Sequence, residues 1–231
     1  MLNLKEECKA ELTGHIIPFW NKLRDDENGG FYGFMNNDLA VDKKADKGVI
    51  LNSRILWFYS SAYRVLGDEK LLDNARHAYE FLRDCCVDRE NGGVYWMMTY
   101  DGKVSDGMKH TYNQAFAIYA LSAYFLASGD EQALELAFEL FDTVEEKCTD
   151  DIAYMEAFSS DWKLIPNDAL SENGLMADKT MNTVLHLIEA YTVLYDASGD
   201  EKKKLTVPAL MELFRNAAGE SLATDRILLG E

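Results

Sequence analysis

One short segment of the sequence occurs twice. The residues ENGGFYGF at 27–34 return as ENGGVYWM at 90–97, 63 residues later. Two further anchors recur three times, namely Ala-Tyr at 62–63, 123–124 and 190–191 and Gly-Asp-Glu at 67–69, 129–131 and 199–201. The repeat length is therefore 62 to 70 residues. Such repetition is typical of chains that stack one supersecondary unit against the next.

Each copy predicts two helices. The first half is nearly all apolar, as in 49–59, and the second half places apolar residues three and four apart, as in 71–82. The Gly-Asp-Glu between them predicts a short turn, because glycine can end one helix and acidic residues suit the start of the next. We expect an all-α fold of stacked helical hairpins, as an open solenoid or a closed α/α barrel with the apolar helices forming the inner ring.

The repeated phrase predicts a turn between consecutive hairpins. Asn-Gly-Gly is a turn signal, and the alternation in FYGF and VYWMMTY predicts short β-hairpin strands. We interpret the phrase as a structural device at one rim of the stack. The alternative is that its aromatic residues contact a sugar.

Composition narrows the function classes. The net charge is −17, so binding to nucleic acid is disfavoured. The longest nearly apolar run, 115–127, is shorter than the about 20 residues that cross a bilayer and predicts a buried helix. The start of the chain, MLNLKEECKAEL, has no apolar segment typical of a secretory signal. Without a CxxC pair, reduced thiols in a cytoplasmic protein are expected rather than a zinc site, at Cys8, Cys85, Cys86 and Cys148.

Polar residues on the apolar helices are the candidates for function. They are Arg54 in VILNSRILWFY, His110, Tyr112 and Asn113 in KHTYNQAFAIY, and Asn182 and His186 on one face of TMNTVLHLIEAY. Counted back from the Ala-Tyr anchors, Arg54, Ala115 and Asn182 occupy equivalent positions. This register predicts that Arg54 and Asn182 converge on one cavity.

For each residue alone, a structural role is the simpler interpretation. A buried guanidinium without a partner is costly, so Arg54 is expected either in an internal salt bridge or facing water. For His186 the alternative is a hydrogen-bonded core histidine. Taken together, these side chains favour a shared polar pocket. Trp57 and Trp96 are interpreted as core residues, with stacking on a sugar ring as the alternative that keeps Trp57 a candidate binding residue.

Four long runs carry a family resemblance: HIIPFWNKLRDDENGGFYG, DKKADKGVILNSRILWFYSSAY, MKHTYNQAFAIYALSAY and ALSENGLMADKTMNTVLHLIEAYT. They resemble the N-terminal part of the cellobiose 2-epimerases, in the N-acylglucosamine 2-epimerase superfamily. The similarity extends from about residue 10 to residue 202. The resemblance implies an (α/α)6 barrel, here an incomplete one of about three and a half hairpins.

The resemblance also implies a reaction. These enzymes invert C2 of the reducing-end glucose of β-1,4-linked disaccharides such as cellobiose and lactose. A histidine removes the C2 proton, a cis-enediolate forms, and a second histidine returns a proton to the other face. No metal or nucleotide cofactor is implied.

By the same resemblance, each candidate has a role. Arg54 would bind the C1 and C2 oxygens and stabilise the enediolate. Tyr112 and Asn182 would hydrogen-bond the reacting sugar, and Asn113 is a further binding candidate. His186 would assist ring opening or orient the substrate.

Six such repeats are longer than these 231 residues, and the family's proton-transfer histidines lie in later repeats. No histidine or tryptophan follows His186 here, and the family likeness fades over 203–231. We expect one partial α/α-barrel domain over 1–231, as a truncated or split chain. Since an open ring exposes apolar flanks, self-association or a complementary C-terminal half is expected.

Other functions stay open. The chain could be a sugar-binding remnant or half-enzyme, an N-acylglucosamine 2-epimerase or an aldose–ketose isomerase. A glycoside hydrolase would need a spaced carboxylate pair. The adjacent pairs Asp25/Asp26 and Glu145/Glu146 are interpreted as solvated surface charges.

Overall fold

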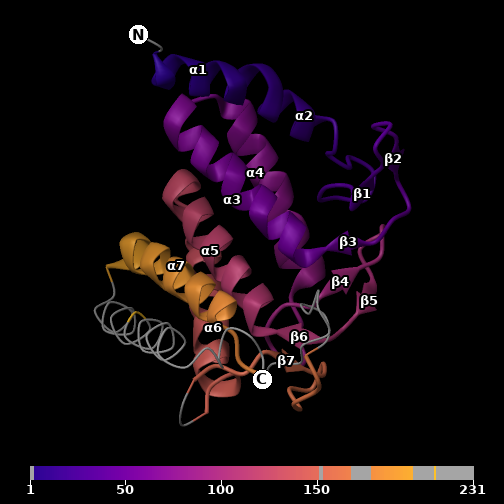
Figure 1. The fold of residues 1–231 in the computed structure, drawn as a ribbon, viewed down its shortest axis with the longest axis vertical. Helices are drawn as coiled ribbons and strands as arrows, with labels where there is room; N and C mark the ends of the chain where they lie inside the picture. Colours follow the sequence, from indigo (N-terminus) through magenta and orange to yellow (C-terminus); the bar gives the residue numbers. More distant parts are fainter. Residues whose placement is uncertain (1–2, 151–152, 168–177, 200–210, 212–231) are drawn as a thin grey trace, which may run out of the picture.

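The computed structural model describes residues 3–150, 153–167, 178–199 and 211. It is a stack of helices with short strands gathered along one side (Figure 1). The chain opens with one nearly continuous helical segment, in which a π-helical stretch joins two α-helices. These are α1 (Leu4–Glu11), η1 (Leu12–Ile16) and α2 (Ile17–Asn21).

Two helical hairpins and the first helix of a third follow. They are α3 (Val49–Leu66) with α4 (Glu69–Phe81), α5 (Thr111–Ser128) with α6 (Glu131–Lys147), and α7 (Met181–Ser198); the π-helical turn η2 (Leu82–Cys86) extends α4. Helix α5 packs on both α3 and α7, whereas α4 and α6 each pack mainly on the helix that precedes them. The predicted hairpins are thus confirmed, with α3, α5 and α7 as the inner layer. The outer partner expected for α7 lies outside the described residues.

The Gly-Asp-Glu turns form as predicted. Gly67, Gly129 and Gly199 each end an inner helix with a positive φ of 66° to 72°. The next residue begins the outer helix in the first two copies, where the carboxylates of Asp68 and Asp130 accept from the backbone N–H groups of Lys70 and Gln132. Glycine adopts this left-handed conformation at little cost, and an aspartate cap stabilises a helix start by about 1 kcal/mol.

The loops between hairpins carry short antiparallel strands, as the alternation predicted. The sheets are β1 (Phe34–Met35) with β2 (Val41–Asp42), β3 (Lys47–Gly48) with β4 (Met97–Met98) and β5 (Val104–Asp106), and β6 (Lys109–His110) with β7 (Ala157–Phe158). Strand β3 leads directly into α3, and β6 leads directly into α5. The strands therefore gather at the end where the inner helices begin (Figure 1).

A buried ion pair holds the first copy of the repeated phrase. The ammonium of Lys47 lies 2.7 Å from the carboxylate of Asp25, and both side chains are fully buried. Lys47 also donates to the carbonyl of Gly29. The interpretation of Asp25 as a solvated charge is therefore wrong, because the turn folds over it and gives it this partner.

The same pair recurs in the next copy. Lys109 lies 2.7 Å from Asp88 and donates to the carbonyl of Gly92. In the third copy Lys179 contacts Asp150 at 2.5 Å, but this pair is partly exposed. An aspartate after each outer helix, or after α2, thus pairs with a lysine two residues before the next inner helix.

Helix α5 is the centre of the fold. Twelve of its 18 residues are buried, as the apolar run at 115–127 predicted. It is apolar on most sides because α3, α6 and α7 all pack against it. Across the ranges that the structure describes, no helix has both the length and the apolar character needed to span a bilayer.

Candidate active site

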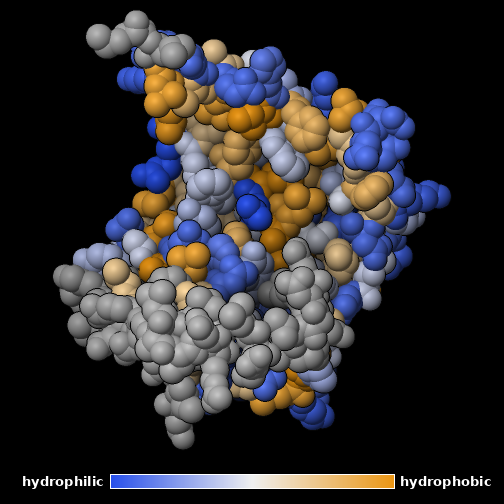
Figure 2. Space-filling model, viewed as in Figure 1, coloured by the Kyte–Doolittle hydropathy of each residue, from blue (hydrophilic) through white to orange (hydrophobic). Residues whose placement is uncertain are grey.

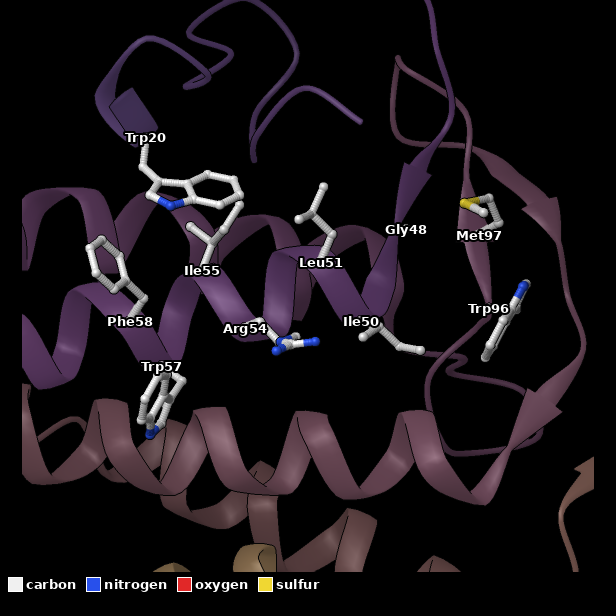
Figure 3. Close-up of a pocket in the computed structure, with 10 residues that line it drawn as sticks. All are labelled: Trp20, Gly48, Ile50, Leu51, Arg54, Ile55, Trp57, Phe58, Trp96 and Met97. Carbon is white, nitrogen blue, oxygen red and sulfur yellow. The ribbon is translucent and has the colours of Figure 1, made fainter. Parts of the chain in front are cut away.

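A cavity of about 630 Å³ lies beside α3. Figure 2 shows a hollow on one face of the molecule, in which orange apolar surface lies beside blue polar surface. The residues that line it come from α2, α3 and the β3–β4 region. They are Trp20, Gly48, Ile50, Leu51, Arg54, Ile55, Trp57, Phe58, Trp96 and Met97 (Figure 3).

Among the described residues that line the cavity, Arg54 is the only charged one. Its side chain leaves α3 on the side that faces α5, between Ile50 and Trp57 (Figure 3). The guanidinium carbon lies 5.4 Å from the centre of the Phe116 ring. Among the described residues no carboxylate pairs with Arg54, so the predicted internal salt bridge is not found. Arg54 is exposed, which confirms the alternative that it faces open space.

The cavity tryptophans are less buried than predicted. Trp57 is 36% exposed and stacks on Tyr119 at 5.5 Å, with the two rings 21° apart. Its interpretation as a core residue is wrong, because α3 faces the cavity at this position. Trp96 is half-buried, packs at 5.1 Å from His110 and lines the other end of the cavity.

The register drawn from the Ala-Tyr anchors is also wrong. The three inner helices have 18 residues each, and Arg54 is the sixth residue of α3. The sixth residues of α5 and α7 are Phe116 and His186, whereas Asn182 is the second residue of α7. Counting 13 residues back from each glycine cap gives this correct set, which the Gly-Asp-Glu anchors could have supplied.

These equivalent residues contact one another across the inner layer. The Arg54 guanidinium covers Phe116, and the Phe116 and His186 rings lie 4.6 Å apart. We call Arg54, Phe116 and His186 the upper rung. Three residues further along each helix, a lower rung is formed by Trp57, Tyr119 and Glu189, in which Trp57 stacks on Tyr119. Burial raises the pKa of Tyr119, and the negative charge of Glu189 raises it further.

His186 has a defined setting. Its Nδ1 lies 2.7 Å from Oε2 of Glu189, and the edge of its ring meets Tyr112 at 4.9 Å and 88°. Its side chain is 19% exposed. A histidine held by a carboxylate and two aromatic rings is oriented for proton transfer at its other nitrogen. Phe116 and Glu189 were missed in the sequence, because neither breaks the helical pattern in which it lies.

The remaining candidate residues, Tyr112, Asn182 and Asn113, lie in three different environments. Tyr112 joins the upper rung through His186, and Asn182 is exposed in the first turn of α7. Asn113 is fully buried, outside the cavity lining, and donates to the carbonyl of Tyr95 at 2.7 Å. This position argues against contact between Asn113 and a sugar. The side chain instead ties the second repeated phrase to α5.

A buried carboxylate is hydrogen-bonded to the first turn of α7. Glu156 accepts from the N–H and hydroxyl of Thr180 and from the hydroxyl of Thr183, at 2.7 to 2.8 Å. Burial raises the pKa of Glu156, although these hydrogen bonds oppose the shift. The side chain therefore closes the start of the helix that carries His186. Glu145 is likewise no free surface charge, because it accepts from the hydroxyls of Tyr154 and Tyr191.

The sequence and the fold agree with one family of proteins. Residues 16–224 match the family model described as N-acylglucosamine 2-epimerase (GlcNAc 2-epimerase). The chain is 66% identical over 196 residues to a cellobiose 2-epimerase of Ruminococcus albus, covering 85% of this chain and 50% of that protein. It is 55% identical to a cellobiose 2-epimerase of Eubacterium cellulosolvens, covering 94% and 54%.

Solved structures agree. A sugar epimerase from a ruminal bacterium superposes with a TM-score of 0.90 at 61% identity, over 92% of this chain and 55% of that one. The chain thus spans about half the length of the relatives it matches. A mannosidase of glycoside hydrolase family 76 from Bacteroides thetaiotaomicron shares the fold alone, at a TM-score of 0.59 and 18% identity.

Proposed function

The chain belongs to the N-acylglucosamine 2-epimerase family, and from that premise we propose that it serves the 2-epimerisation of β-1,4-linked disaccharides such as cellobiose and lactose. In this proposal the cavity beside α3 receives the reducing-end glucose. The observation that carries the proposal is Arg54, an exposed guanidinium in a wall of apolar and aromatic side chains.

The chemistry needs such a group. Removing the proton from C2 of an open-chain aldose breaks the C2–H bond and leaves its electrons in a C1–C2 double bond. Negative charge then develops on the oxygen of C1. A guanidinium set in a wall of apolar side chains can donate hydrogen bonds to this oxygen, and these bonds strengthen once a bound sugar has displaced the water around it.

The aromatic residues supply the binding surface. Trp20, Trp57 and Trp96 present large flat rings at different sides of the cavity (Figure 3). A pyranose has apolar C–H faces that pack on such rings, while its hydroxyls seek polar partners. Tyr112 and Asn182 are proposed as those partners, and His186 as the group that assists ring opening.

The test is exchange of hydrogen at C2. The purified chain is incubated with lactose or cellobiose in heavy water, and loss of the C2 proton signal is followed by NMR. Replacing Arg54 by alanine should lower the exchange rate by about 10² to 10³-fold, the loss typical of removing one oxyanion donor. Arg64→Ala is the matched control, because Arg64 is exposed in the last turn of the same helix.

Binding is followed separately. Three of the four tryptophans line the cavity, so their fluorescence should change when disaccharide is added. If the intact chain shows neither a change in fluorescence nor exchange at C2, the proposal is refuted.

A second candidate function is sugar binding without catalysis. It is favoured by the described lining of the cavity, which offers aromatic rings and a guanidinium but no histidine or carboxylate that could move a proton. In that case disaccharide changes the fluorescence without exchange at C2. Exchange that returns on adding the C-terminal part of a longer relative would support a complementary half, and light scattering would test self-association.

A further inference from the structure

Glu189 fixes the proton position on a neighbouring histidine. Its Oε2 lies 2.7 Å from Nδ1 of His186, one helical turn earlier on α7. An ionised carboxylate can only accept a hydrogen bond, so Nδ1 must donate. A neutral imidazole carries one proton, and Nε2 is then left with its lone pair.

The ring is held as well as protonated. The edge contact with Tyr112 at 4.9 Å and the Phe116 ring at 4.6 Å restrict the rotation of His186. No residue in the described part of the chain bonds its Nε2. The lone pair is therefore available as an acceptor, and the contacts of the upper rung connect this ring through Phe116 to Arg54.

We propose that Glu189 is a positioning residue, which holds His186 in the Nδ1–H tautomer and so keeps Nε2 as a proton acceptor. Its link to sugar chemistry rests on the proposed function. In ring opening, Nε2 takes the proton of the C1 hydroxyl, the C1–O5 bond breaks as the C1 carbonyl forms, and the imidazolium returns the proton to O5. The carboxylate of Glu189 stabilises that imidazolium while it exists.

The chain contains its own reference for the opposite tautomer. Nε2 of His77 lies 3.1 and 2.9 Å from the carbonyl oxygens of Asp25 and Gly30. Carbonyls only accept, so His77 must carry its proton on Nε2. An exposed analogue of the proposed pair also exists, since Nδ1 of His15 lies 2.7 Å from Glu11 on the first helical segment.

The experiment is long-range ¹⁵N–¹H NMR of the full chain labelled with ¹⁵N-histidine. Spectra are recorded about two units above the ordinary histidine pKa of about 6.5, so that neutral rings dominate. All four histidines lie in the described residues, and single His→Gln variants assign them. His186 should show the Nδ1–H pattern and His77 the Nε2–H pattern.

Variants then test the cause. In Glu189→Ala the ratio of Nδ1–H to Nε2–H at His186 should fall about tenfold, which corresponds to about 1.4 kcal/mol and to the low end for a hydrogen bond to a charged group. Glu189→Gln keeps an acceptor oxygen but no charge, and should fall between. Glu11→Ala is the control and should leave His186 unchanged.

Four outcomes decide between these possibilities. A wild-type tautomer ratio at His186 in Glu189→Ala overturns the proposal, as does an Nε2–H pattern in the unmodified chain. A shifted ratio together with a fall in C2 exchange confirms both the positioning and its use. A shifted ratio in a chain that neither binds nor exchanges sugar confirms the positioning and refutes the proposed function instead.

Discussion

Replacing Lys109 by methionine tests how the repeated loops are held together. The ammonium of Lys109 lies 2.7 Å from Asp88, and the two side chains are 0% and 2% exposed. Methionine matches the length of lysine but leaves the Asp88 carboxylate buried beside an apolar group. Breaking a buried pair from one side costs about 3–5 kcal/mol, because an uncompensated charge stays behind.

That loss is large for a protein of this size. Folded domains are stable by about 5–15 kcal/mol, so one side chain would remove a large fraction. For chains of 150–250 residues each kcal/mol lowers the melting temperature by about 2–4 °C, which predicts a fall of roughly 6–20 °C in a thermal melt followed by circular dichroism. The matched control is Lys163→Met, whose partner Asp161 lies at the same 2.7 Å but whose side chain is 80% exposed. An exposed pair contributes only about 0–1 kcal/mol.

A second variant isolates the reason for the loss. Asp88→Asn, added to Lys109→Met, removes the unpaired charge and keeps an oxygen for the backbone N–H groups of Glu90 and Asn91. The double variant should therefore recover part of the stability. If Lys109→Met melts within about 2 °C of the unmodified chain, as Lys163→Met should, the buried pair does not stabilise the loop as argued.

Three further predictions concern stability. Burial raises the pKa of Asp88, but hydrogen bonds from Lys109 and the backbone lower it more. The stabilisation from Asp88 is therefore present above about pH 4 and lost as the pH falls through the lowered pKa. The melting temperatures at pH 7 and about pH 3 should therefore differ less in Asp88→Asn than in the unmodified chain. Gly93→Ala and Gly129→Ala both force alanine to a positive φ at about 1–2 kcal/mol, but at Gly93 the new Cβ would also lie 2.6 Å from a tryptophan ring, so its melting temperature should fall further, and equal falls would contradict this. Glu156→Ala should speed hydrogen exchange in the first turn of α7, by about 1–3 kcal/mol of lost protection, whereas Thr192→Ala on the exposed face of the same helix should not.

The hairpins were predictable because their signals are local. Apolar periodicity marks both helices of a copy, and Gly67 with Asp68 ends one helix and caps the next within two residues. The predicted register of the cavity residues was wrong for a physical reason. Ala-Tyr is a packing pair that lies five, six and nine residues before the glycine caps, so it marks a helix face without fixing a position.

The charges were harder to place. Asp25 and Lys47 lie 22 residues apart, and Asp88 and Lys109 lie 21 apart, so their pairing depends on how each loop folds back. Pattern reasoning sends a charged side chain to the surface, because burial is favourable only when a partner arrives from elsewhere in the chain. The recurrence of an aspartate and a lysine in each copy can be found in the sequence, but only once the copies are aligned in the correct register.

The three copies of the repeat are alike at some positions and different at others. The aspartate and lysine that close each loop are the same residue types in all three, at Asp25, Asp88 and Asp150 and at Lys47, Lys109 and Lys179. The sixth residue of each inner helix is different in every copy, being a guanidinium, a phenyl ring and an imidazole. The fold thus presents one scaffold position three times over, and each copy carries a different chemical group at it. Comparison of a chain with itself separates its frame from its chemistry, without any second sequence.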